Sequence, residues 1–216
     1  MNIAIDGPAG AGKGTIAREV AKRLNLVYVD TGAMYRAMGY YFSCKNIDGH
    51  DMDTVCRECG NVDISIKYID GEQVVFCNGE DVNDKIRTPR AGEMASLISV
   101  YEPVRERLVK LQQNLARETG VVMDGRDIGT VVLPKAELKI YLNASCHERA
   151  KRRYLELRAK GEDVNLEQVE RDIIQRDERD MNREISPLKK AEDAVEVDST
   201  DMTIGQVTDY IIGLVK

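Results

Sequence analysis

The chain has 216 residues, of which 43% are hydrophobic and 31% are charged. These proportions indicate a globular protein with a sizeable core and exclude an intrinsically disordered chain. The formal net charge is −6, so we expect no nucleic-acid partner and no membrane surface as partner, because both favour basic proteins. No run approaches the roughly 20 apolar residues of a membrane span, and no basic leader is visible, so we expect a cytoplasmic protein.

Short apolar segments alternate with amphipathic helical patterns along most of the chain. The sequence predicts strands at residues 2–6, 26–29, 121–123, 138–142 and 194–197. It predicts helices at residues 13–24 and 31–44 and a closing helix from about residue 203. Apolar strands separated by helices indicate an α/β fold, with a five-stranded parallel sheet covered by helices on both faces.

Two regions interrupt this rhythm. Residues 62–69 alternate apolar and polar, Asp70-Gly71 is typical of a hairpin turn, and residues 73–77 return as a strand. We therefore expect a small antiparallel insert at about residues 60–88. Residues 145–185 predict two arginine-rich helices separated by Gly161. The resulting prediction is one domain, 1–216, with a core of residues 1–59, 89–144 and 186–216 and a helical lid at about 145–185.

A glycine-rich loop lies directly after the first strand and directly before the first helix. That context is typical of a P-loop, whose backbone N–H groups approach phosphate oxygens so closely that side chains must be absent. A helix N-terminus favours the same anion, and Lys13 supplies a charge for the β- and γ-phosphates. The residues that we expect to hold a nucleoside triphosphate are Gly7, Pro8, Ala9, Gly10, Ala11, Gly12, Lys13, Gly14 and Thr15.

Two residues are candidates for contact with Mg²⁺. The generic motif places Ser or Thr directly after the lysine, whereas here Gly14 intervenes and Thr15 comes one place later. This ending resembles that of nucleoside monophosphate kinases and favours a water-mediated contact between Thr15 and the metal. Asp124 ends an apolar strand, as a Walker-B acid does, and is the second, indirect candidate; a turn or capping role is the alternative for it.

The acceptor can be inferred in part from what accompanies the loop. No histidine or other obvious general base accompanies the P-loop, and no glutamate follows Asp124, which favours transfer over hydrolysis. A phosphate acceptor is already an anionic nucleophile and needs cations rather than a base. Arginines of the 145–185 region could supply them, although interspersed Glu and Asp residues also fit two solvated helices with salt bridges.

Four segments together resemble the bacterial cytidylate kinases. They are the P-loop, residues 30–36 (DTGAMYR), residues 124–132 (DGRDIGTVV) and residues 176–183 (RDERDMNR). The resemblance extends from residue 2 to the C-terminus and includes the hairpin insert, which is similar to that family's monophosphate-binding region. It implies an ATP-dependent kinase, with Mg²⁺, that acts on CMP and dCMP; we expect a monomer.

The resemblance also assigns site residues. It implies that Thr31 and Arg36 hold the acceptor and its phosphate, and that Ser96, Arg105 and Asp127 face the cytosine ring. It implies that Asp180 and the arginines of the lid reach the ribose and phosphates. The predicted catalytic cations are Lys13, Arg126, Arg176 and Arg183, and Arg126 and Arg183 also bind substrate.

The chemistry of this assignment is reasonable by itself. A carboxylate such as Asp127 accepts from the cytosine amino group, whereas uracil reverses the donor and acceptor pattern there. A structural carboxylate paired with Arg126 or with backbone is the alternative for Asp127.

The rival functions are a kinase for UMP, AMP or another acceptor, a regulatory nucleotide-binding NTPase, and an inert interaction module. Cys56 and Cys59 lack a second ligand pair and are expected to be ordinary thiols rather than half of a zinc site.

Overall fold

A computed structural model describes residues 1–215 of the chain. The chain divides into two compact units. Unit 1 comprises residues 1–28 and 119–215, and unit 2 comprises residues 29–118. Within the described part of the chain, no helix has both the length and the apolar composition that a membrane span needs.

Unit 1 contains the central parallel sheet. The strand order is β2-β6-β1-β7-β8, and β1 pairs in parallel with both β6 and β7, as β7 does with β8. The predicted five-stranded parallel sheet is therefore confirmed, and β2 runs across the boundary between the units. The elements are β1 (Asn2–Asp6), α1 (Lys13–Leu24), β2 (Val27–Asp30), β6 (Val121–Gly125), a π-helical turn (Ile128–Val132), β7 (Leu138–Asn143), α6 (Cys146–Ala159), α7 (Leu166–Asn182), β8 (Val195–Asp198) and α8 (Ile204–Gly213).

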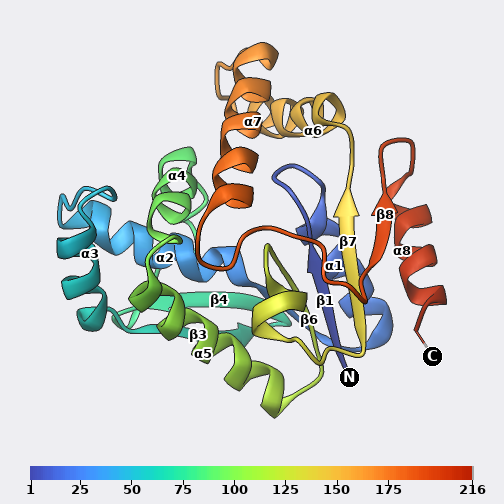
Figure 1. Cartoon of the computed structure of the whole chain (residues 1–216), viewed down its shortest axis with the longest axis horizontal. Coiled ribbons are helices and arrows are strands. Elements are labelled where there is room, and N and C mark those ends of the chain that lie inside the picture. Colours follow the sequence, from blue (N-terminus) through green and yellow to red (C-terminus); the bar gives the residue numbers. More distant parts are fainter. Residues whose placement is uncertain (216) are drawn as a thin grey trace. The chain divides into compact units, whose positions relative to one another are not determined.

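The core of unit 1 lies between the sheet and two helices. Ile3 and Ile5 of β1 are fully buried against Ile16 and Val20 of α1, and Ile211 of α8 completes the cluster. Residues 16 and 20 lie one helical turn apart, so they share one face of α1. In Figure 1, α1 and α8 lie beside the strands of this sheet. The buried face fixes where α1 begins, directly after the glycine-rich loop.

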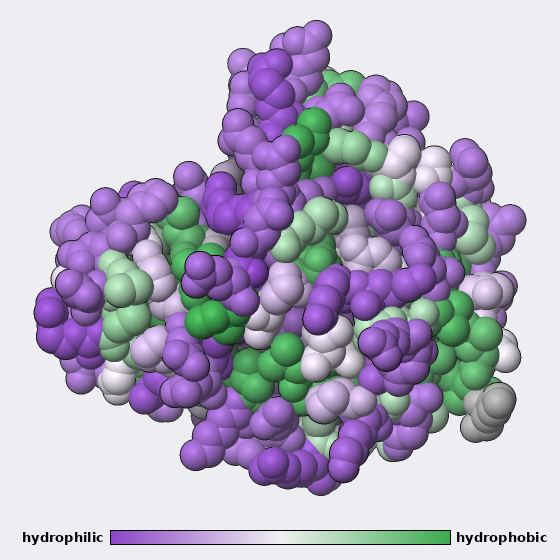
Figure 2. Space-filling view, in the orientation of Figure 1, coloured by the Kyte–Doolittle hydropathy of each residue, from purple (hydrophilic) through white to green (hydrophobic). Residues whose placement is uncertain are grey.

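Helices α6 and α7 form a hairpin beyond the carboxyl end of β7 (Figure 1). Ser145 caps α6 by accepting from the Glu148 N–H, and Gly161 has φ 81° at the turn, where a side chain would be strained. The pair has a small core of its own around Leu157, Val169 and Ile173. Its outer surface is mainly hydrophilic (Figure 2). The hairpin thus depends on modest burial and on contacts at its base.

Unit 2 combines helices with a three-stranded antiparallel sheet of order β3-β4-β5. Asp70 and Gly71, both with positive φ (51° and 82°), form the tight turn between β3 and β4, as the Asp-Gly pair predicts. A Cβ on Gly39 of α2 would lie 3.0 Å from Met94 Cγ of α4, so a glycine allows these helices to approach closely. The elements are α2 (Thr31–Cys44), α3 (Met52–Glu58), a 3₁₀ turn (Cys59–Asn61), β3 (Ile64–Ile69), β4 (Glu72–Cys77), β5 (Glu80–Asp81), α4 (Pro89–Ile98) and α5 (Glu102–Glu118).

A buried carboxylate joins two parts of unit 1. Asp6, at the end of β1, accepts the backbone N–H of Ile128 at 2.8 Å and that of Gly129 at 2.7 Å. These two donors begin the π-helical turn that follows β6. Because both N–H groups are buried, this carboxylate determines how residues 126–129 leave the sheet.

We predict that Asp6→Ala lowers the free energy of unfolding by about 3 kcal/mol, because two buried N–H groups would lose their acceptor. Urea denaturation measures this change. The matched control is Asp209→Ala, which breaks only the exposed ion pair with Arg23 and should change stability little. Equal effects of the two substitutions would contradict the role given to Asp6.

Candidate active site

Close packing requires glycine at two positions of the loop between β1 and α1. A Cβ on Gly7 would lie 2.0 Å from the backbone oxygen of Leu142, and one on Gly10 would lie 2.9 Å from that of Arg149. Gly10 also has φ 75°, which strains any residue with a side chain. The loop is therefore pressed between the ends of β7 and α6, and its backbone turns into the N-terminus of α1, a position suited to a bound anion.

Lys13 is buried, with 6% of its surface exposed, and its Nζ donates to the Pro8 carbonyl at 2.7 Å. Burial, reinforced by the nearby Arg126 guanidinium, holds the pKa of Lys13 well below its usual value. Arg176 acts in the same direction, and Asp124 and Asp180 oppose both. Cations held this close together favour binding of an anion at this loop.

Asp124 lies at the carboxyl end of β6, beside the loop. Its Oδ1 accepts from the Tyr28 hydroxyl at 2.9 Å, and its Oδ2 would lie 4.0 Å from a Cβ on Gly14. Thr15, in the first turn of α1, is exposed. Carboxylate and hydroxyl oxygens fit Mg²⁺. Among residues 1–215, no group of three or more His, Cys, Asp or Glu side chains is placed to hold a metal.

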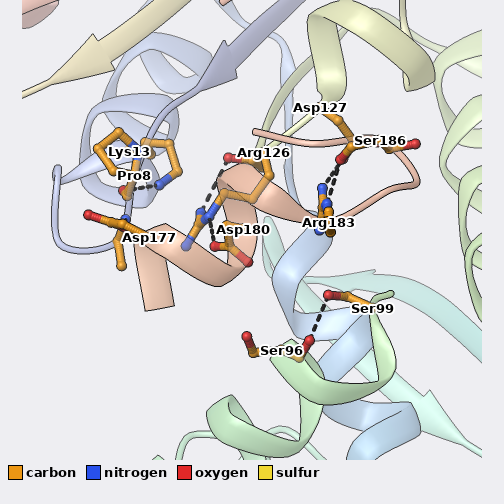
Figure 3. Close-up of polar contacts among 12 residues, drawn as sticks. Pro8, Lys13, Ser96, Ser99, Arg126, Asp127, Asp177, Asp180, Arg183 and Ser186 are labelled. Atoms are coloured by element: carbon orange, nitrogen blue, oxygen red, sulfur yellow. Dashed lines mark hydrogen bonds and ion pairs between the residues drawn. The ribbon is translucent and has the colours of Figure 1, made fainter. Parts of the chain in front are cut away.

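Two ion pairs join α7 and its following residue to the segment after β6 (Figure 3). Arg126 Nε contacts Asp180 Oδ2 at 2.8 Å, and Arg183 Nη2 lies 3.6 Å from Asp127 Oδ1. Arg183 also donates to the Ser186 carbonyl. Asp127 therefore pairs with Arg183. Four predicted site residues of unit 1 thus lie together in a buried charge network.

The charge of Asp180 is stabilised by its neighbours. Burial would raise the pKa of Asp180, but the guanidinium groups of Arg126 and Arg176 outweigh it and hold this pKa below its usual value. Asp6, which positions the same segment, differs: burial raises the pKa of Asp6 to about 6 despite its two N–H donors.

Five further arginines of the 145–185 region fall into two groups. Arg152, Arg153, Arg158 and Arg171 make ion pairs with Glu148, Glu156, Asp163 and Glu167 on the helices or the turn between them. These four are the solvated surface pairs that the interspersed acids suggested. Arg149, in contrast, is buried and bonded to Asp177 and to the P-loop.

Unit 2 places Thr31 and Arg36 at the start of α2. Asp30 caps this helix by accepting from the Ala33 N–H at 2.9 Å, and its second oxygen pairs with Arg36 Nη2 at 2.8 Å. Gln73 of β4 holds the cap by bonding both the N–H and the C=O of Asp30. Thr31 is buried. The β3–β4 hairpin therefore supports the beginning of α2 and, through Asp30, the orientation of Arg36.

Ser96 and Arg105, on α4 and α5, are connected through Ser99. The Ser99 hydroxyl donates to the Ser96 carbonyl at 2.9 Å, and Arg105 Nη1 contacts the Ser99 carbonyl at 3.4 Å. Ser96 and Arg105 are about 95% buried. The backbone carbonyls of Ser96 and Ser99 thus link these two predicted site residues in one buried polar cluster.

Sequence reasoning missed several supporting residues. Asp6 was visible as a charged residue ending an apolar strand, which is the available signal that it serves a structural or site role. Gln73 and Tyr28 gave no signal, because their partners are more than 40 positions distant in the chain. The burial of Arg149 also gave no signal in the sequence, because the helix carries several arginines and charge spacing does not distinguish them.

We predict a specific acid dependence for Asp180. Its pKa in the folded state is lowered, so the ionised carboxylate stabilises the fold at pH values above the unfolded pKa, and this contribution is lost as the pH falls through the folded pKa. The difference in unfolding free energy between the wild type and Asp180→Asn should be largest near neutral pH and should shrink below about pH 4. Urea denaturation from neutral pH down to below about pH 4 measures this difference. A difference in unfolding free energy that stays constant or grows in acid would contradict the prediction.

Comparison with known proteins agrees over nearly the full chain. The family model described as Cytidylate kinase matches residues 3–216. A cytidylate kinase of Caldicellulosiruptor bescii is 53% identical over 99% of this chain and 95% of its own length. One from Bacillus thuringiensis is 50% identical over 100% of this chain and 96% of its own length.

The solved structures extend the comparison to the fold alone. An uncharacterized protein from Eubacterium ventriosum has a TM-score of 0.51 at 13% identity, over 99% of this chain and 96% of that one. The sequence matches, in contrast, combine high identity with almost complete coverage. The chain therefore belongs to the cytidylate kinase family.

Proposed function

We propose that the protein transfers the γ-phosphoryl group of ATP to CMP, and also to dCMP, giving ADP and CDP or dCDP. The single observation that supports this most is the buried Lys13 in a loop of close-packed glycines, with Arg126 and Arg176 acting on it. Three cations near one loop suit charge neutralisation rather than proton abstraction. Family membership names the acceptor.

The donor is assigned to the P-loop. Backbone N–H groups of residues 7–15 and the Lys13 ammonium would surround the β- and γ-phosphates, because this loop is small enough for direct approach. Asp124 and Thr15 would hold the Mg²⁺ that accompanies ATP, through water. Bound there, the ion would neutralise charge on the phosphates.

The acceptor phosphate is assigned to Arg36. Its Nη2 is engaged by Asp30, while its buried Nε has no hydrogen-bond partner among residues 1–215. A buried guanidinium N–H without an acceptor is costly, and a phosphate oxygen is a suitable partner for it. Thr31, buried beside this helix start, is assigned to the same substrate.

The base is assigned to Asp127, Ser96 and Arg105. All three are more than 90% buried and polar, as a site that must distinguish cytosine from uracil requires. Asp127 would accept from the cytosine amino group, and Asp180 and Arg183 would contact the ribose and phosphate. We further propose that residues 60–88 serve monophosphate binding, and that residues 145–185 act as the lid.

The reaction then needs no enzymic base. An oxygen of the CMP phosphate attacks the γ-phosphorus, the new O–P bond forms, and the bond to the β,γ-bridging oxygen breaks, leaving ADP. Lys13, Arg126, Arg176 and Arg183 would neutralise the charge that moves between the two nucleotides. A lid that excludes water would prevent hydrolysis of ATP.

We predict that a panel of CMP, dCMP, UMP and AMP separates the rival acceptors. With saturating ATP, kcat/KM should be highest for CMP, and Lys13→Met should abolish transfer to every acceptor. Coupled detection of ADP measures each rate. Equal or higher values with UMP or AMP would contradict the assignment of CMP, and ATP turnover that is independent of any acceptor would favour a regulatory NTPase.

The variant Asp127→Asn refines the same experiment. An amide can donate as well as accept, so the preference for CMP over UMP should fall by roughly 1–3 kcal/mol of discrimination. A preference that is unchanged would remove Asp127 from base recognition while leaving the phosphotransferase activity intact.

A further inference from the structure

The base of the α6–α7 hairpin binds directly to the P-loop. Asp177 Oδ1, on α7, accepts from the Ala9 N–H at 3.1 Å, and Arg149 Nη1, on α6, donates to the Ala9 carbonyl at 2.8 Å. The two side chains also pair with each other at 2.6 Å. A single residue of the loop is thus held on both of its backbone polar groups by two helices from the other end of the chain.

The bond from Asp177 acts on the position of Lys13. In a planar trans peptide the carbonyl and the following N–H point in opposite directions, and the peptide bonds of this loop are trans. The Ala9 N–H belongs to the same peptide unit as the Pro8 carbonyl, which receives the Lys13 Nζ at 2.7 Å. Asp177 and Lys13 therefore hold opposite edges of one peptide plane (Figure 3).

The bond from Arg149 acts on the next peptide plane. The Ala9 carbonyl shares this plane with the Gly10 N–H, so fixing the carbonyl on Arg149 directs that N–H to the opposite side. Rotation of this plane would instead turn a carbonyl oxygen toward a bound anion. Arg149 Nε is itself anchored on the Ala144 carbonyl at 3.0 Å, just after β7. The Arg149 guanidinium therefore connects the end of β7 to the loop and fixes the loop relative to the sheet.

Stability alone does not account for this pair. Both side chains are buried, with Arg149 and Asp177 each 7% exposed. Removing two charges from water is costly, and buried ion pairs can often be replaced by apolar residues without loss of stability. The surface pair His147–Glu170 also joins α6 to α7, at 3.6 Å, without touching the loop.

We propose that Arg149 and Asp177 are positioning residues that set the orientation of the Pro8–Ala9 and Ala9–Gly10 peptide planes, and so place the Lys13 ammonium and the Gly10 N–H for the triphosphate. The proposal rests on ATP being the donor. Since Asp177 lies three residues before Asp180 on α7, the same clamp fixes the helix that carries Arg176 and Asp180 relative to the P-loop.

The test compares binding of ATP with binding of CMP, each measured by isothermal titration calorimetry, in Arg149→Met, Asp177→Ala, Asp177→Asn and Glu170→Gln. ATP affinity should fall about tenfold or more in the first two variants, because each loses a bond that involves a charged group. It should fall less in Asp177→Asn, whose amide oxygen can still accept from the Ala9 N–H. CMP affinity should fall clearly less than ATP affinity, because Arg149 and Asp177 contact the P-loop directly and act on the CMP-assigned Asp180 only through α7. Glu170→Gln is the matched control and should match the wild type for both ligands.

A double variant separates positioning from simple stabilisation. In Arg149→Met/Asp177→Leu the buried charges are replaced together, so the melting temperature should recover relative to the single variants while ATP affinity and kcat stay low. If ATP affinity returns together with stability, or if ATP and CMP affinity decline in parallel, the proposal is wrong. If Arg149→Met and Asp177→Ala do not fold, the same comparison is made with Asp177→Asn and the double variant. In these two variants ATP affinity should again fall more than CMP affinity. An inactive wild type would overturn the proposed function instead.

Discussion

The buried Lys13 ammonium, bonded to the Pro8 carbonyl, is the interaction on which the rest of unit 1 depends. A charge in this position is unfavourable unless an anion or a dipole compensates it. The loop glycines, the N-terminus of α1 and Asp124 create a place where phosphates can supply that compensation. The surrounding packing, from Asp6 to the α6–α7 hairpin, holds the loop in this shape.

The parallel sheet, the hairpin insert and the P-loop could all be predicted, because each has a local signal: apolar runs, the Asp70-Gly71 turn, and the glycines before Lys13. Helices α4 and α5 were not predicted, and Thr88, which caps α4, was not recognised. The pairing of charges was also beyond the sequence. Asp127 bonds to Arg183, 56 positions later, and only the fold decides which acid and which base meet.

The arginine-rich region shows this limit most clearly. Charge spacing correctly suggested surface ion pairs, and four arginines make them. It could not show that Arg149 faces inward, because burial depends on the P-loop packing against α6. The supporting residues of the candidate site are therefore visible only in the fold, whereas the residues assigned to substrate follow from family resemblance.

We expect the chain to move a phosphoryl group between nucleotides rather than to water. Phosphorus NMR of the protein with ATP and Mg²⁺, recorded with and without CMP, tests it most directly. We expect CDP and ADP to appear in equal amounts when CMP is present, with almost no inorganic phosphate. Inorganic phosphate that accumulates at the same rate with and without CMP would contradict the account.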